Sequence, residues 1–91
     1  MKSVSNLRDL VVEVMSSKVR IKILKLLVER ESLNISAIVR ETKLNHKIVK
    51  ENLDYLVERG VVNEVILGRV RAYRLNYSNP VARAIRDLFT S

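Results

Sequence analysis

The chain has no cysteine, one histidine, two glycines and one proline among its 91 residues. Without cysteine it can form no disulfide, no thiol nucleophile and no thiolate metal site. A cluster of His and Cys ligands would need a second histidine, and a Ser–His–Asp triad would depend on His46 alone. We therefore expect no metal, no cofactor and no enzymatic activity. His46 is more simply interpreted as a polar surface residue.

The sequence also lacks a long apolar run. No stretch approaches the ~20 residues of a transmembrane helix. The opening residues, MKSVSNLRDLVVEV, carry acidic side chains where a secretory signal would be apolar. Hydrophobic residues make up 47% of the chain and charged residues 30%, which is typical of a soluble globular domain. We therefore expect one domain over residues 1–91, in the cytoplasm and without membrane contact.

Acidic residues are too few to balance the basic ones. The chain has 17 Lys and Arg against 10 Asp and Glu, a formal net charge of +7. On so small a chain this excess favours a polyanionic partner such as nucleic acid, although solubility alone also explains it. The positions of the cations along the chain must decide between these two interpretations.

Apolar spacing and β-branched runs predict a mainly α-helical protein with one β-hairpin. Helices are expected over residues 4–15, 18–30, 37–42 or 37–43, 46–59 and 80–91. The hairpin is expected over residues 61–75, with Gly68 between its strands. A two-residue and a three-residue loop give opposite facings for one strand, but both leave Arg69 at the tip. This order predicts a winged helix-turn-helix core over residues 16–75 with a flanking helix at each end.

Small polar residues and glycine mark the expected helix ends. Ser16-Ser17 precedes the second helix, Ser36 is expected to cap the third, and Asn45 the fourth. Gly60 follows the fourth helix, where a left-handed backbone is favourable. Residues 31–34 are expected to be a short connection, and residues 76–79 to cap the last helix, which opens with Pro80.

The fourth helix separates into an apolar face and a charged face. Val49, Leu53, Leu56 and Val57 share one side, whereas the other side carries His46, Lys47, Lys50, Glu51, Asp54 and Glu58. Cations come first and acids later, which suits entry of the N-terminal end into a major groove of DNA. Lysine can donate to guanine and glutamate can accept from cytosine. The simpler alternative is an ordinary solvated surface helix.

Two further basic segments extend this hypothesis. The hairpin segment GRVRAYRL contains Arg69, Arg71 and Arg74 and no acid, as expected of a wing that reaches an adjacent groove or the DNA backbone. A solvated edge that discourages aggregation is the alternative. The first half of the second helix offers Lys18, Arg20 and Lys22 as candidate backbone contacts, although a solvated face explains them more simply.

Residues 16–75 resemble the winged-helix domain of ArsR-like bacterial and archaeal transcription regulators. SSKVRIKILKLLVE is similar to the family's opening helix, and GRVRAYRL is similar to its wing. The segment ISAIVRETKLNHKIVKENLDYLVERGVV is similar to its helix-turn-helix, which ends here in Leu53, Leu56 and Gly60. Thr42 and Lys43 depart from the pattern, since the family usually has an apolar residue and a glycine there. The Cys and His clusters with which many members sense metals are absent.

The resemblance implies a sequence-specific DNA-binding repressor or activator that acts as a homodimer near the nucleoid. It implies that Asn45, His46, Lys47, Lys50 and Glu51 belong to the recognition helix, and that Arg69 and Arg71 lie at the wing tip. The outer helices add apolar stripes that we expect to form a two-fold dimer interface: Leu7, Val11, Val14, Val81, Ile85 and Leu88. A near-palindromic operator follows from that symmetry. Alternatively, both helices pack within one chain.

Two other functions remain open at this stage. Three acids on a DNA-facing helix are unfavourable next to phosphate, which favours a winged-helix module that binds proteins in a transcription or replication assembly. A non-specific architectural DNA-binding protein would differ from a regulator by a small ratio of specific to random affinity.

Overall fold

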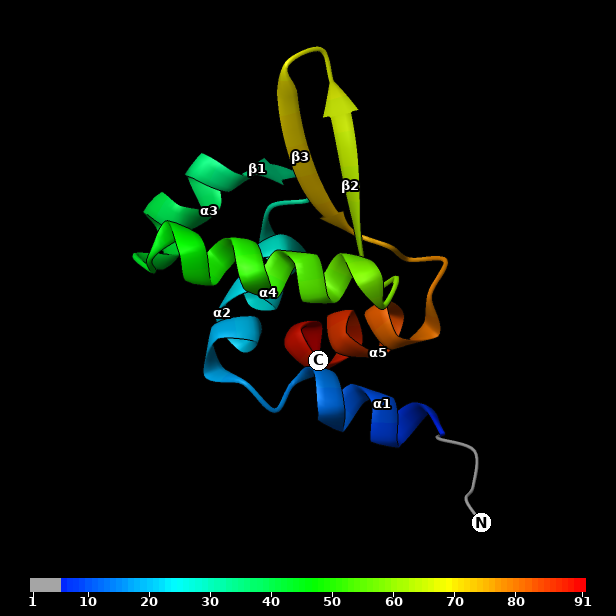
Figure 1. The fold of residues 1–91 in the computed structure, drawn as a ribbon. Coiled ribbons are helices and arrows are strands. Elements are labelled where there is room, and N and C mark those ends of the chain that lie inside the picture. The colour runs from blue at the N-terminus through cyan, green and yellow to red at the C-terminus, as the bar shows by residue number, and fades with distance from the viewer. Residues whose placement is uncertain (1–5) are drawn as a thin grey trace.

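The computed structural model describes residues 6–91 as five helices and a small antiparallel sheet with strand order β1-β3-β2 (Figure 1). The elements are α1 (Leu7–Val14), α2 (Lys18–Glu29), β1 (Leu33–Asn34), α3 (Ile35–Thr42), α4 (His46–Glu58), β2 (Val62–Leu67), β3 (Val70–Leu75) and α5 (Pro80–Thr90). The β2–β3 hairpin projects from a helical body as a wing, with α4 beneath it in this view. The predicted mainly α winged helix-turn-helix is confirmed. Val4, which belongs to the first predicted stripe, lies outside the described residues.

Most helix ends lie where the sequence predicts them. Ser17 accepts a hydrogen bond from the amide of Arg20 at the start of α2, and Asn79 accepts one from Val81 at the start of α5. Asn45 caps α4 in the same way, and Gly60 follows that helix with a φ of 74°. These side chains satisfy amides that have no partner within their own helix.

Two expectations for residues 31–36 are wrong. The segment predicted as a connection contains β1, which pairs with β3 through Leu33 opposite Tyr73 and Asn34 opposite Ala72. Asn34, not Ser36, caps α3, because its Oδ1 accepts from the amide of Ala37 at 2.8 Å. A two-residue strand is too short to show alternation in the sequence. Its partner strand also lies about 40 residues away along the chain, so no local hairpin signal marks it.

The wing turns through a two-residue loop. Leu67 pairs with Val70, so Gly68 and Arg69 form the turn, and Gly68 adopts a φ of 64°. This register resolves the alternative that the sequence left open and confirms Arg69 at the tip. Successive residues of a strand face opposite sides, so Arg71 shares a face with Tyr73 whereas Arg74 lies on the other face.

All five helices contribute to one apolar core. Residues that are fully buried come from four helices, the sheet and the position before β2: Ile23, Leu24, Leu27, Ile38, Val49, Leu53, Leu56, Val61, Val62, Tyr73, Leu75, Ala82 and Ile85. The first helix, α1, adds Val14, which is 3% exposed. The core fixes α4 against α2 and α3, and thereby fixes the side of α4 that is exposed. Within residues 6–91, no helix is long and apolar enough to cross a membrane.

The predicted dimer interface is wrong for three of its residues. Val14, Val81 and Ile85 are only 3%, 5% and 0% exposed, because α1 and α5 pack against the core of their own chain. These side chains are therefore not available to a partner. Leu7 and Leu88 are 45% and 59% exposed, and Val11 is half-buried, so these three remain candidates.

Candidate nucleic-acid interface

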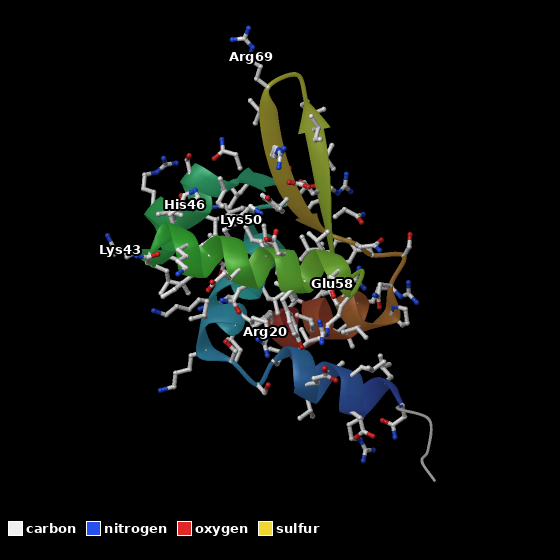
Figure 2. The ribbon with its side chains drawn as sticks, in the orientation of Figure 1. Arg20, Lys43, His46, Lys50, Glu58 and Arg69 are labelled. Carbon is white, nitrogen blue, oxygen red and sulfur yellow. The ribbon has the colours of Figure 1, made fainter. Side chains whose placement is uncertain are left out.

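The two faces of α4 are separated as the sequence predicts. Val49, Leu53 and Leu56 are fully buried in the core. His46, Lys47 and Glu51 are exposed on the opposite side, and Lys50 is half-buried beside them. Figure 2 shows His46 and Lys50 on the side of α4 that faces the wing, with Arg69 at the tip above. The recognition-helix candidates and the wing tip therefore lie on the same side of the molecule.

Asn45 orients the first turn of α4. Its Oδ1 accepts hydrogen bonds from the amides of Lys47 at 2.7 Å and Ile48 at 3.3 Å. The cap commits this oxygen to the helix and fixes the backbone from which the exposed side chains of His46 and Lys47 project. The positive end of the helix dipole lies at the same place and favours an anion there.

Lys50 is paired with an acid on its own helix. Its Nζ lies 2.8 Å from both carboxylate oxygens of Asp54, one turn further along α4. The side chains of Lys50 and Asp54 are 42% and 57% exposed, so the pair is weak, about 0.3–0.5 kcal/mol. A nucleic acid that binds Lys50 has only this weak contact to displace.

The wing arginines differ in their surroundings. Arg71 lies 3.6 Å from Glu64, whose carboxylate also accepts a 3.0 Å hydrogen bond from the hydroxyl of Tyr73. Burial, reinforced by that hydrogen bond, raises the pKa of Tyr73 to about 12, so the hydroxyl stays protonated and keeps donating. Within residues 6–91, Arg71 is the one wing arginine that forms an ion pair. Arg69 and Arg74 are exposed on the tip and on the opposite face.

Arg20 does not lie where a contact with the DNA backbone would require it. Its Nε donates to the carbonyl of Val14 at 2.7 Å, and a terminal nitrogen donates to the carbonyl of Glu13 at 3.1 Å. Its guanidinium also lies 4.2 Å from the centre of the Tyr55 ring. Figure 2 shows Arg20 on the side of α4 away from the wing. The expectation of a DNA contact is therefore corrected, because Arg20 caps the end of α1 and links it to α4.

The other two candidates on α2 stay exposed. Lys18 lies in the first turn of the helix, and Lys22 lines a shallow groove together with Glu29 and Glu41. Within residues 6–91, neither lysine forms an ion pair. Their role as backbone contacts stays a prediction.

We expect Arg20→Ala to destabilise the fold without changing the electrostatics of DNA binding. The variant loses three charge-assisted hydrogen bonds, to the carbonyls of Val14 and Glu13 and to the hydroxyl of Ser16, and a cation–π contact. Together these contacts are worth about 2 kcal/mol for a half-buried group. Urea unfolding should report this loss, whereas the exposed neighbour Lys22→Ala should stay within about 0.5 kcal/mol of wild type. The salt dependence of DNA binding should be unchanged. If Arg20→Ala kept wild-type stability but its DNA binding depended less steeply on salt, Arg20 would instead be a DNA contact.

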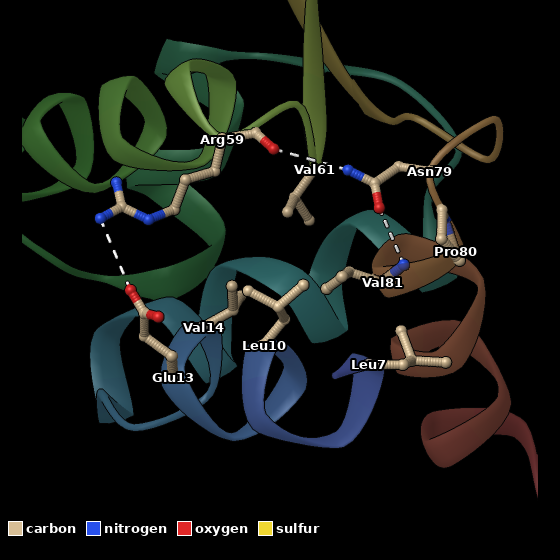
Figure 3. Close-up of a pocket in the computed structure, with 9 residues that line it drawn as sticks. All are labelled: Leu7, Leu10, Glu13, Val14, Arg59, Val61, Asn79, Pro80 and Val81. Atoms are coloured by element: carbon tan, nitrogen blue, oxygen red, sulfur yellow. Dashed lines mark hydrogen bonds and ion pairs between the residues drawn. The ribbon is translucent and has the colours of Figure 1, made fainter. Parts of the chain in front are cut away.

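Sequence reasoning missed a joint between α1, α4 and α5. Glu13 accepts a 3.4 Å hydrogen bond from the hydroxyl of Tyr55 and lies 3.6 Å from Arg59, whose guanidinium stacks 3.7 Å from the Tyr55 ring centre. Beside this ion pair lies a cavity of about 370 Å³ with a mostly apolar lining, shown in Figure 3. Asn79 closes one side, where its side chain bonds to the carbonyl of Gly60 and to the amide of Val81. The 42-residue separation of Glu13 and Tyr55 explains why spacing could not reveal the joint.

Among residues 6–91 there is no group of three or more His, Cys, Asp or Glu side chains that could hold a metal ion. Lys47, Arg69 and Arg74 are exposed on α4 and the wing. Exposed lysine, arginine and histidine side chains can bind phosphate and base edges.

Comparison with known proteins agrees with this geometry. Residues 17–64, just over half of the chain, match the family described as bacterial regulatory protein, arsR family. No curated protein is recognisably similar to the chain in sequence.

Several solved structures share the fold. The transcriptional repressor PagR of Bacillus anthracis is 26% identical with a TM-score of 0.76, over 92% of this chain and 93% of PagR. The transcriptional repressor BigR from Xylella fastidiosa has a TM-score of 0.80 at 21% identity, over 88% of this chain and 77% of BigR. Mb0332 from Mycobacterium bovis, described as a homodimeric winged helix-turn-helix DNA-binding domain, has a TM-score of 0.75 at 24% identity, over 97% and 86% of the two chains.

Four observations lead to the same conclusion: the order of the elements, the exposed basic start of α4, the β2–β3 wing with its two-residue turn, and the family match. The chain belongs to the ArsR family of regulatory proteins and has the winged-helix fold of a DNA-binding transcription regulator, not of an enzyme.

Proposed function

We propose that the protein is a sequence-specific regulator that binds double-stranded DNA as a homodimer in the cytoplasm. The observation that carries this proposal is that His46 and Lys50, near the start of α4, lie on the same side of the molecule as Arg69 at the tip of the wing (Figure 2). These are the two places at which a winged helix meets a major groove and the adjacent groove or backbone.

The side chains divide into base-reading and backbone-binding groups. His46, Lys47, Lys50 and Glu51 lie at the leading end of α4 and read base edges. Asn45 holds the helix start, and Arg69, Arg71 and Arg74 bind phosphate or a narrow minor groove from the wing. Lys18 and Lys22 add backbone contacts.

The homodimer forms through the outer side of α1 and α5. A groove of about 620 Å³ runs between these helices, and six of the residues that line it are Leu7, Arg8, Val11, Val12, Ala84 and Leu88. Exposed apolar side chains of this density on a small domain favour burial against a partner. Because Mb0332 is described as homodimeric, a two-fold arrangement is the first to test. It would place the two copies of α4 on half-sites about 34 Å apart in a near-palindromic operator.

Selection of the purified protein against a random duplex library tests this function. The winning duplex and a scrambled duplex are then titrated by fluorescence anisotropy at 50 and 200 mM salt. A near-palindromic winner that binds at least 1,000-fold more tightly than the scrambled duplex supports a dimeric regulator. Steep salt-dependent binding without enrichment would contradict it and indicate an architectural DNA-binding protein.

A winged-helix module for protein contacts is the second candidate. Glu51, Asp54 and Glu58 are exposed along α4, and acids on this face oppose the approach of phosphate. Negligible DNA binding at both salt concentrations, together with stoichiometric recovery of a transcription or replication protein, would favour this function. Asp54 is partly offset by Lys50, which favours the DNA-binding proposal.

A further inference from the structure

The turn between α3 and α4 contains a lysine in a left-handed backbone conformation. Lys43 has φ 59° and ψ 27°, values that glycine adopts without strain and other residues adopt at a cost. Gly60 and Gly68 adopt positive φ elsewhere in residues 6–91, and Glu31, with a φ of 21°, is the other non-glycine residue that does. A glycine at position 43 would therefore form the same turn more favourably.

The lysine side chain adds nothing that the turn needs. The backbone amide of Lys43 donates to the carbonyl of Val39 at 2.9 Å, a bond that glycine would also make. Thr42 completes the turn, because its hydroxyl donates to the carbonyl of Ile38 and accepts from the amide of Leu44. Lys43 is exposed and takes part in no ion pair within residues 6–91. The strained backbone at Lys43 is not offset by an ion pair of its side chain within residues 6–91, which suggests that the side chain contacts a binding partner.

The position of Lys43 indicates what that benefit is. Figure 2 shows Lys43 and His46 together at the leading end of α4, which is the end proposed to enter the major groove. Arg40 is exposed one turn earlier on α3. The first helix of a helix-turn-helix crosses the DNA backbone at the edge of the groove that the second helix enters. A cation at the junction of the two helices therefore lies beside the phosphates that border this groove.

We propose that Lys43 is a phosphate anchor for the DNA backbone at the edge of the groove that α4 enters, with Arg40 as its neighbour. One charge-assisted contact to phosphate would offset the cost of placing lysine instead of glycine in a left-handed backbone. This inference rests on the proposed DNA-binding function and adds to it two residues that the recognition-helix and wing candidates do not include.

Lys43→Gly removes the backbone strain and the charge together, and thermal stability and DNA affinity report the two effects separately. We expect it to raise the thermal unfolding midpoint while it weakens binding to operator and scrambled duplexes alike, by about fivefold at 100 mM salt. The slope of log Kobs against log salt should fall in magnitude by about 0.9, the value for one phosphate contact. Lys43→Arg should keep both wild-type affinity and slope. Arg40→Ala should lower the slope by a similar amount.

Glu31→Gly is the matched control, because it makes the same replacement at the other non-glycine residue with positive φ. It should not weaken DNA binding. Unchanged affinity and slope in Lys43→Gly, with wild-type protein still binding DNA, would overturn the anchor and leave the proposed function intact. Wild-type protein that binds neither duplex would overturn the proposed function itself. An equal loss of affinity in both glycine variants would assign the effect to backbone flexibility and would also overturn the anchor.

Discussion

Leu88→Glu is expected to convert the protein into a monomer and to weaken its binding to a two-half-site operator by at least 100-fold. Leu88 is 59% exposed beside the groove between α1 and α5, so the charge is solvated in the monomer and the fold should be kept. In a dimer formed through this groove, the carboxylate would be removed from water among mostly apolar side chains, and Arg8 is the one basic residue among the described residues that line the groove. A monomer contacts one half-site only, so it loses the gain in affinity from binding two linked half-sites, which is typically 10²–10⁴-fold.

Sedimentation equilibrium at micromolar concentration measures the first effect, and titration of full and single half-site duplexes measures the second. Ile66→Glu is the matched control, because Ile66 is similarly exposed at 62% but lies on the wing. It should stay dimeric. Binding of Leu88→Glu to a single half-site should equal that of wild type. A variant that remains dimeric would show that α1 and α5 do not form the interface.

Helices α1 and α5 illustrate what apolar spacing can predict. The stripes on both helices are real, but a stripe indicates only that a face is covered and not which surface covers it. Val14 and Ile85 are covered by their own chain, whereas Leu88, on the same predicted stripe as Ile85, is exposed. Phe89, one residue further along α5, still packs against the core, so the distinction depends on which face of the helix the tertiary arrangement covers.

The buried and exposed faces of α4 were predicted correctly because they depend on local periodicity. The faces of α4 follow from its 3.6-residue repeat, and the cap at Asn45 follows from residue type. Arg20 was misassigned because its partners, the carbonyls at the end of α1 and the ring of Tyr55, carry no signal at the level of spacing. The pairing of Lys50 with Asp54 was readable from their spacing of four residues.

That pairing makes Lys50 the residue with the largest expected effect on specificity. On random DNA, Asp54 offsets the charge of Lys50, so the lysine should add little to binding through phosphate attraction. On the operator, a good contact of Lys50 with guanine is worth about 1–3 kcal/mol, more than the weak exposed pair that it replaces. Lys50→Ala should therefore weaken operator binding by about 10- to 100-fold and leave binding to scrambled DNA almost unchanged.

Asp54→Asn should act in the opposite direction on the same pair. It removes the charge that offsets Lys50, so affinity for scrambled DNA should rise and its salt dependence should steepen by up to about 0.9 in slope. Arg69→Ala provides the comparison, because loss of an exposed wing cation should weaken binding to both duplexes equally and flatten the salt dependence. Anisotropy titrations of all three variants on both duplexes at 50 and 200 mM salt measure these effects. Equal weakening of both duplexes by Lys50→Ala would make Lys50 a phosphate contact, and the reading of bases would then fall to His46, Lys47 and Glu51.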